Sequence, residues 1–189
     1  MRGLIEGIAF RPATGAYYFG DVHLRCVWLR TPDGRVTRFS APDDRLLGVF
    51  RVAVDEARGA LWVSMGALEQ MDGFAPKHKG AGGLAELDLA TGAVRRVVMA
   101  PDDGAPHLLG DFVQLADGTI LATDVATAIT AVDVLTADPA MPDATLGTLV
   151  GGDLVFIGDG GWNRFEPGKV DASPRPVPVL KVPWAAPRR

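Results

Sequence analysis

The sequence has a single cysteine, Cys26, among its 189 residues. One cysteine cannot form an internal disulfide, so cysteine content gives no argument for an oxidising compartment. Because Cys26 lies in the apolar segment CVWLR, we expect a buried strand cysteine rather than a nucleophile. No apolar run approaches the length of a membrane span or a secretory signal. The expected location is therefore the cytoplasm, with the periplasm as the alternative if a leader has been lost.

Positive charge is also scarce, because 19 Lys and Arg residues stand against 23 Asp and Glu residues, a net charge of −4. Such a balance offers no general attraction for nucleic acid or for an anionic membrane, so neither partner is expected. The sequence also lacks a Gly-x-Ser-x-Gly elbow and a phosphate-binding loop, which argues against a serine hydrolase and a nucleotide-dependent enzyme. The histidines His23, His78 and His107 do not have the spacing of metal ligands.

Glycine and proline, in contrast, are abundant, with 23 and 14 residues. They stand between apolar runs rather than in tracts, which is typical of a turn-rich all-β chain. The apolar content of 48% and the charged content of 22% are ordinary for a folded protein. A chain of this length can bury a real core, and we expect one domain over residues 1–189.

A repeated unit organises these runs. The first, EGIAFRPATGAYYFGDV (6–22), has two apolar segments joined by a turn with Pro12 and Gly15, and predicts a β-hairpin. The outline returns at VFRVAVDEARGALWVSM (49–65), GDFVQLADGTILATD (110–124) and TLGTLVGGDLVFIGD (145–159). Alignment by spacing places Glu6, Phe50, Asp111 and Leu146 at equivalent positions, followed by Asp21, Met65, Asp124 and Asp159. Recurrence of aspartate at the strand end indicates a structural role, in which each accepts hydrogen bonds from its own loop.

Each of the first two units continues into a second, more polar hairpin, so four strands recur about every 40–45 residues, the period of a propeller blade. A sandwich would not repeat its strands in groups of four. The sequence therefore predicts an all-β propeller of four-stranded antiparallel blades, at about 3–41, 47–100, 108–135 and 144–184.

The last two units are incomplete, and about three and a half blades are present in all. The third has only one candidate for a further strand, at 128–134, and the fourth has GWNRF (161–165) and VPVLKVP (177–183) for its outer half. An open ring leaves apolar faces and sheet edges bare. Two copies could cover them by pairing, so a homo-oligomer formed through the open blade edges is one expectation.

Four ordered segments resemble the SMP-30/gluconolactonase/LRE-like β-propeller family, in its bacterial branch. They are EGIAF-x-P-x-TG, GVFRVAVD-x-x-RG-x-LWV, PHLLGDF-x-x-x-ADGTI-x-ATD and LG-x-LVGGDLVFIGDGGWNRF. The resemblance covers residues 3–125 and about 143–184. It implies a six-bladed fold from which about two middle blades are absent in this chain, at the point where the strand count also falls short.

The resemblance further implies a metal-dependent hydrolase of sugar lactones or related esters. In that family a divalent cation, calcium or alternatively zinc, lies in the central channel and acts as a Lewis acid on the carbonyl. Glu6 matches the first metal ligand of the family; the alternative is a strand-start glutamate that faces solvent. Asp111 follows Gly110, where the family has a substrate-contacting Asn, and is a candidate metal or substrate contact or else a loop cap.

His107 and His23 lie where related sequences also have histidine, and they are candidate substrate-binding residues at the channel mouth. The remaining family ligands, including the catalytic base, would lie in the absent blades, so no catalytic residue can be assigned. The resemblance thus implies a gluconolactonase-like hydrolase that is impaired or inactive as this shortened chain. The alternative is a non-catalytic propeller that binds a small lactone-like or sugar-like ligand, or a protein partner.

Overall fold

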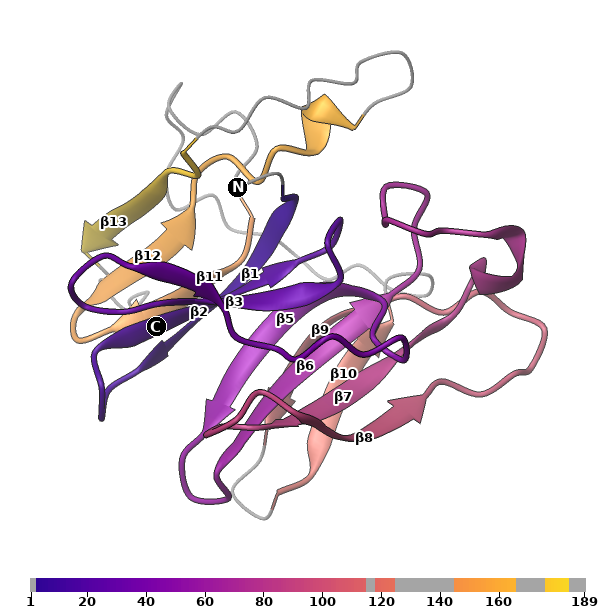
Figure 1. Ribbon diagram of the computed structural model, residues 1–189, viewed down its shortest axis with the longest axis horizontal. Helices are drawn as coiled ribbons and strands as arrows, with labels where there is room; N and C mark the ends of the chain where they lie inside the picture. The colour runs from indigo at the N-terminus through magenta and orange to yellow at the C-terminus, as the bar shows by residue number, and fades with distance from the viewer. Residues whose placement is uncertain (1–2, 115–117, 125–144, 166–175, 184–189) are drawn as a thin grey trace, which may run out of the picture.

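The computed structural model describes residues 3–114, 118–124, 145–165 and 176–183, which form four antiparallel sheets (Figure 1). The first sheet has the strands β1 (Ile5–Arg11), β2 (Ala16–Asp21), β3 (Cys26–Arg30) and β4 (Val36–Arg38). The second has β5 (Gly48–Asp55), β6 (Ala60–Gly66), β7 (Gly82–Asp88) and β8 (Val94–Met99). The third has β9 (Leu109–Gln114) and β10 (Ile120–Asp124), and the fourth has β11 (Gly147–Val150), β12 (Asp153–Ile157) and β13 (Val179–Pro183).

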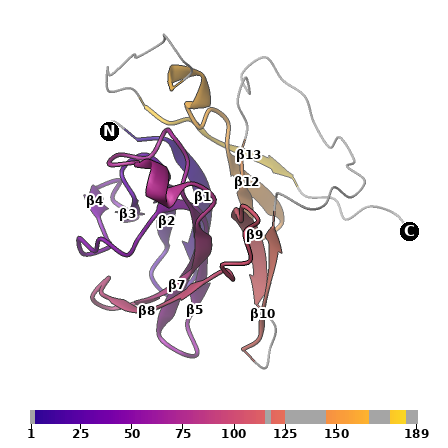
Figure 2. The same ribbon diagram turned by 90° about the vertical axis from the view of Figure 1, so that its right-hand side faces the viewer.

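The first strand of each sheet lies innermost, and these strands adjoin one another. Strand β1 lies between β5 and β11, while β5 also contacts β9. The order of sheets is therefore fourth, first, second, third, and the last sheet of the chain lies beside the first (Figure 1). Seen from the side, the β9–β10 hairpin forms a layer behind the second sheet (Figure 2). This arrangement confirms the predicted all-β propeller of antiparallel blades.

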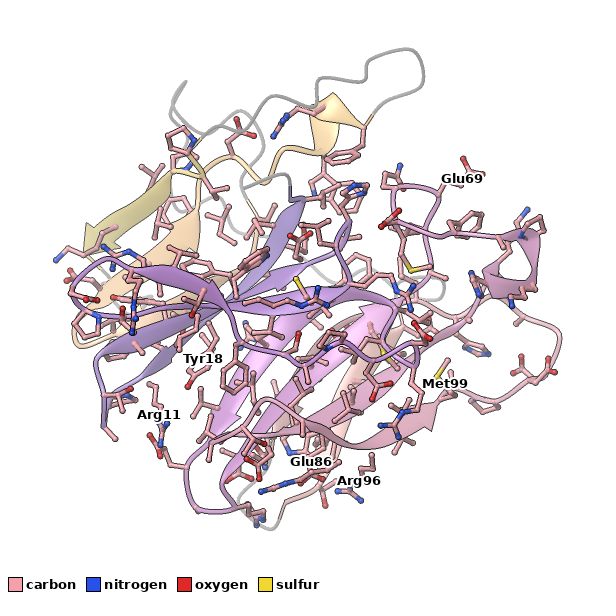
Figure 3. The ribbon with its side chains drawn as sticks, viewed as in Figure 1. Arg11, Tyr18, Glu69, Glu86, Arg96 and Met99 are labelled. Atoms are coloured by element: carbon pink, nitrogen blue, oxygen red, sulfur yellow. The ribbon has the colours of Figure 1, made fainter. Side chains whose placement is uncertain are left out.

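Apolar side chains fill the spaces between neighbouring sheets. The largest cluster joins the first two sheets, where Tyr18 packs edge-on against Phe39 with ring centroids 4.9 Å apart (Figure 3). A second cluster joins the first and fourth sheets through Ile8, Phe19 and Ile157. Each of these side chains, when fully buried, contributes about 1.5–3 kcal/mol relative to exposure, so the spaces between the sheets are the main source of stability.

The outer strands are polar on one side, as the alternation of residues predicts. Glu86 on β7 faces Arg96 on β8, and Arg96 Nε donates to the Glu86 carboxylate at 2.6 Å (Figure 3). The guanidinium of Arg96 also lies 4.9 Å from the centre of the Trp62 ring. Both residues belong to the outer strands of the second sheet, where this ion pair joins β7 to β8.

Several local expectations have a clear outcome. The turn Pro32-Asp33-Gly34 forms, with φ +88° at Gly34, and the loop after β6 contains a short 3-10 helix, η1 (Pro76–His78). The segment GWNRF contains another 3-10 helix, η2 (Trp162–Arg164), rather than a strand, while β13 pairs directly with β12. The candidate strand at 128–134 lies outside the described residues. No helix in the part of the chain that is described is long and apolar enough to cross a membrane.

Candidate functional site

A β-bulge interrupts the inner hairpin at the same place in three sheets. The pairing shifts by one residue directly after the equivalent pairs Ile5–Asp21, Val49–Met65 and Leu109–Asp124. Such a bulge redirects the side chains of the inner strand. Counted from these pairs, Glu6, Phe50 and Gly110 are equivalent, whereas Asp111 corresponds to Arg51. The alignment by spacing was therefore wrong by one residue in the third unit, because Leu109 and Asp124 are one residue closer in the sequence than Ile5 and Asp21.

Arg51 extends from the bulge of β5 towards two other sheets. Its Nε lies 3.4 Å from Oδ1 of Asp111 on β9, and its Nη1 donates to the carbonyl of Gly147 on β11 at 3.3 Å. The Nε is buried and has no hydrogen-bond partner among the described residues. Its contact with Asp111 is an ion pair that does not meet the geometry of a hydrogen bond. An arginine on the second sheet thus bridges the third and the fourth near the common axis.

The bulge that carries Arg51 is itself held by Ser64. The backbone N–H of Arg51 donates to Ser64 Oγ at 3.1 Å, and this hydroxyl donates to the carbonyl of Gly110 at 3.3 Å. Ser64 is fully buried, so its two bonds satisfy a hydroxyl that would otherwise destabilise the fold. The base of the arginine is therefore fixed to the strand beside it and to the third sheet.

Glu6 occupies the equivalent bulge in β1 and is half-buried. Its carboxylate accepts a hydrogen bond of 2.6 Å from Nε1 of Trp162, at the start of η2. Its carbonyl accepts from the Thr145 hydroxyl at 2.9 Å and from the Leu146 N–H. Trp162 also stacks over Phe50 at 6.5 Å. Glu6 thus lies where the first, second and fourth sheets meet, and we name Glu6, Arg51, Asp111 and Trp162 the axial cluster.

The two candidate histidines have partners of their own. Nδ1 of His107 contacts Asp124 Oδ2 at 2.6 Å, and its Nε2 contacts Asp103 Oδ1 at 3.0 Å. These hydrogen bonds, the one to Asp124 first, raise the pKa of His107 above its ordinary value. The His23 ring contacts the Gln70 carbonyl through Nδ1 at 2.6 Å. Both rings therefore have contacts that brace loops.

The strand-end aspartates have the predicted structural role. Oδ1 of Asp21 accepts the backbone N–H groups of Leu4 and Leu24, while Oδ2 accepts Nε1 of Trp28. Burial raises the pKa of Asp21 despite these bonds, which favour the ionised form. Asp159 likewise accepts the N–H of Gly161 in its own loop, whereas Asp124 accepts the N–H of Leu108, just before the inner strand. Each carboxylate joins the end of one strand to the segment beside it.

Cys26 is buried and free, as expected. Burial, assisted by the nearby charge of Asp21, raises the pKa of its thiol to about 12. The thiolate needed for nucleophilic attack is therefore negligible at neutral pH.

The expected divalent cation does not fit the residues that are described. Within them, no group of three or more His, Cys, Asp or Glu side chains is close enough to hold a metal ion. A calcium-type ion needs several oxygen ligands. Instead, the carboxylate of Glu6 is bonded to an indole N–H, and Asp111 lies against the positive guanidinium of Arg51. Each carboxylate of the axial cluster thus already faces an N–H group of another side chain.

Arg51 and Ser64 were missed by the sequence reasoning. One signal for Arg51 was present, because it is the only charged residue in the apolar run GVFRVAV. Ser64 offered none, since a serine in a strand is ordinary and its role depends on a hydrogen bond to another sheet.

No family model matches the sequence, and no curated protein matches it.

Among solved structures, the chain is similar to a catalytically inactive variant of Staphylococcus aureus virginiamycin B lyase, solved with quinupristin. That match has 10% identity and a TM-score of 0.45, over 99% of this chain and 42% of the lyase. Kuenenia stuttgartiensis hydrazine synthase matches at 12% identity and TM-score 0.49, over 94% of this chain and 41% of that one. A streptogramin B lyase matches at 13% identity and TM-score 0.38, over 97% and 56%. The chain spans less than half the length of the first two, and these similarities do not indicate its activity.

Proposed function

We propose that this chain is a non-catalytic propeller segment that binds a small hydroxylated carboxylate, of the sugar-acid type, at the axial cluster. The observation that carries the proposal is the side chain of Arg51, which is 25% exposed near the common axis and whose Nε has no hydrogen-bond partner among the described residues. A guanidinium presents its N–H donors in a planar fork that suits a carboxylate. The neighbouring carboxylate of Asp111 is 48% exposed and offers an acceptor for ligand hydroxyl groups.

The surroundings of Arg51 support binding rather than hydrolysis. The Arg51 guanidinium already donates to the Gly147 carbonyl and lies against Asp111, so less side-chain entropy is lost when a ligand is bound. Among the described residues, the carboxylate beside Arg51 is that of Asp111, which is paired with Arg51 itself. A ligand carboxylate would bond to the exposed part of the Arg51 guanidinium, and its hydroxyl groups would bond to Asp111.

Calorimetric titration with gluconate tests this proposal, with glucose as the matched ligand that lacks the carboxylate. We expect gluconate to bind and glucose to bind at least about tenfold more weakly, because a charge-assisted hydrogen bond is lost. Arg51→Gln should remove the preference for gluconate, whereas Arg35→Gln, which deletes an exposed charge elsewhere, should not. Equal affinity for the two ligands, or binding that survives Arg51→Gln unchanged, would refute it.

A metal-dependent lactonase is the second candidate, and the place of Glu6 on the innermost strand favours it. Its remaining metal ligands would have to come from outside the described residues. The test is the opening of gluconolactone with added calcium or zinc, which Glu6→Gln should abolish. Calorimetry that detects no metal binding to the whole chain would exclude this candidate and leave the first one standing.

A further inference from the structure

A cavity of about 900 Å³ separates the outer parts of the first and fourth sheets. At the inner end of this space the sheets are in contact, with Ile5 and Phe19 packed against Val155 and Ile157. Further out the sheets differ, because the first has four strands and the described part of the fourth has three. Among the described residues, no strand lies opposite the outermost strand of the first sheet, and the cavity is found there.

One wall of the cavity is aromatic because the pairing of β2 with β3 places large side chains on the same face of the sheet. Tyr17 on β2 is paired with Arg30 on β3, and Phe19 is paired with Trp28. Side chains of paired residues lie on the same face of a sheet, so all four line the cavity. The Trp28 indole N–H is already bonded to Asp21, which fixes the ring in the wall.

The opposite wall is aliphatic, with Val155 on β12, Val179 on β13, and Val177 just before it. Cavities of this size with apolar walls and a few convergent polar groups are typical of small-molecule sites. Arg30 and Lys181 both line the cavity, and no Asp or Glu is among the described residues that line it. The lining therefore combines an apolar interior with positive charge.

The two cations differ in what they can still bind. Nζ of Lys181 already pairs with Asp153 at 2.8 Å. Arg30, by contrast, has no ion pair or side-chain hydrogen bond with any residue of the described segments. The hydroxyl of Tyr17, its neighbour in the register, likewise has no hydrogen-bond partner there. An unpaired guanidinium and a phenol thus lie side by side at one end of an apolar cavity.

We propose that this cavity binds an amphipathic carboxylate, such as a medium-chain fatty acid. The apolar body lies between the aromatic wall and the valines, and the carboxylate accepts hydrogen bonds from Arg30 and Tyr17. Burial of the hydrocarbon supplies most of the affinity, because each buried methylene removes apolar surface from water. The guanidinium supplies selectivity for the charged end of the ligand over a neutral polar group.

Calorimetric titration of the whole chain with decanoate, below its micellar concentration, tests this site. The neutral ligand 1-decanol, of the same length, is the control. We expect decanoate to bind about tenfold more tightly than decanol, and Arg30→Gln to remove this difference while decanol binding is retained. Arg35→Gln deletes the same charge from the same hairpin outside the cavity and should leave both affinities unchanged.

Two further variants keep the proposal testable if Arg30→Gln perturbs the hairpin. Val36 is 44% exposed and paired with Arg30, so Val36→Glu places a carboxylate that neutralises the guanidinium. It should abolish the preference for decanoate. Val179→Trp fills the cavity and should abolish binding of both ligands. The proposal is overturned if decanoate does not bind, if it binds no better than decanol, or if Val179→Trp leaves binding intact.

Discussion

At the scale of single residues, the strand-end aspartates explain why aspartate recurs along this chain. Asp21 accepts the N–H of Leu4, and Asp124 accepts the N–H of Leu108, the residue just before the inner strand in each case. The second sheet has the buried Met65 at this position instead. The motif is therefore a local clamp and not a ligand set, although its periodicity alone could suggest either.

His107 leads to a prediction of how the stability of the protein depends on pH. Its pKa is raised, first by Asp124 and then by Asp103, from an ordinary value of 6.5. Because the folded pKa exceeds the unfolded one, the stability gained is fully present below pH 6.5 and is lost as the pH rises through the folded pKa. Asp103→Asn should lower the imidazole pKa towards 6.5, as measured by NMR titration. Asp102→Asn, in the same loop, is the control, and an imidazole pKa at or below 6.5 in the unaltered chain would contradict the prediction.

At the scale of elements, the bulges decide which inner side chains reach the axis. A spacing argument assumes strict alternation, and a single extra residue in the strand breaks that assumption. Because the bulge lies at the same place in three sheets, the offset of Asp111 came from the shorter third hairpin, and Asp111 is the counterpart of Arg51 and not of Glu6. The bulged inner strands also lie in close contact with their neighbours, and glycine permits this contact because it has no Cβ.

Substitution of Gly7 tests whether β1 and β5 are in backbone contact. A Cβ at this position would lie 2.0 Å from the carbonyl oxygen of Phe50, a backbone atom that cannot move alone. We expect Gly7→Ala to lower the free energy of unfolding by about 3 kcal/mol, measured by denaturant titration. Gly152→Ala is the matched control, because no atom lies within 4 Å of its added Cβ. Equal, small effects of the two substitutions would show that the inner strands are not in contact here.

At the scale of the whole molecule, part of the third sheet has exposed apolar side chains. Phe112 is buried against the second sheet, but Val113 and Leu121, paired on the opposite face, are 57% and 55% exposed. Contiguous exposed apolar residues on a short sheet promote association. Pairing of two copies through the open blade edges stays a prediction.

Replacement of both Val113 and Leu121 by threonine tests the role of this face. Threonine keeps the β-branched shape that strands favour and removes apolar surface. We expect less concentration-dependent light scattering and an unchanged midpoint of thermal unfolding. Exchange of Val98 for threonine, on the outer strand of the second sheet, serves as the control. Scattering that is equal in all three proteins would show that this face plays no part in association.

The sequence by itself determined the hairpins, their turns and the all-β class. These features depend on alternation and turn residues that lie close together in the chain, as in the units that begin at Glu6 and Val49. It also indicated Glu6 as a residue of interest, because a carboxylate in an apolar strand is conspicuous. The clamp formed by Asp21 could be predicted for the same reason, since most of its partners are local.

Only the tertiary structure decided what meets at the axis and what lines the cavity. Thr145 bonds to Glu6 across 139 positions of the chain, and Arg51 bonds to Gly147 across 96. No periodicity relates such residues, because their proximity follows from the order in which the sheets pack. The fourth sheet came to lie beside the first through buried apolar contacts, and that packing created both the axial cluster and the cavity beside Arg30.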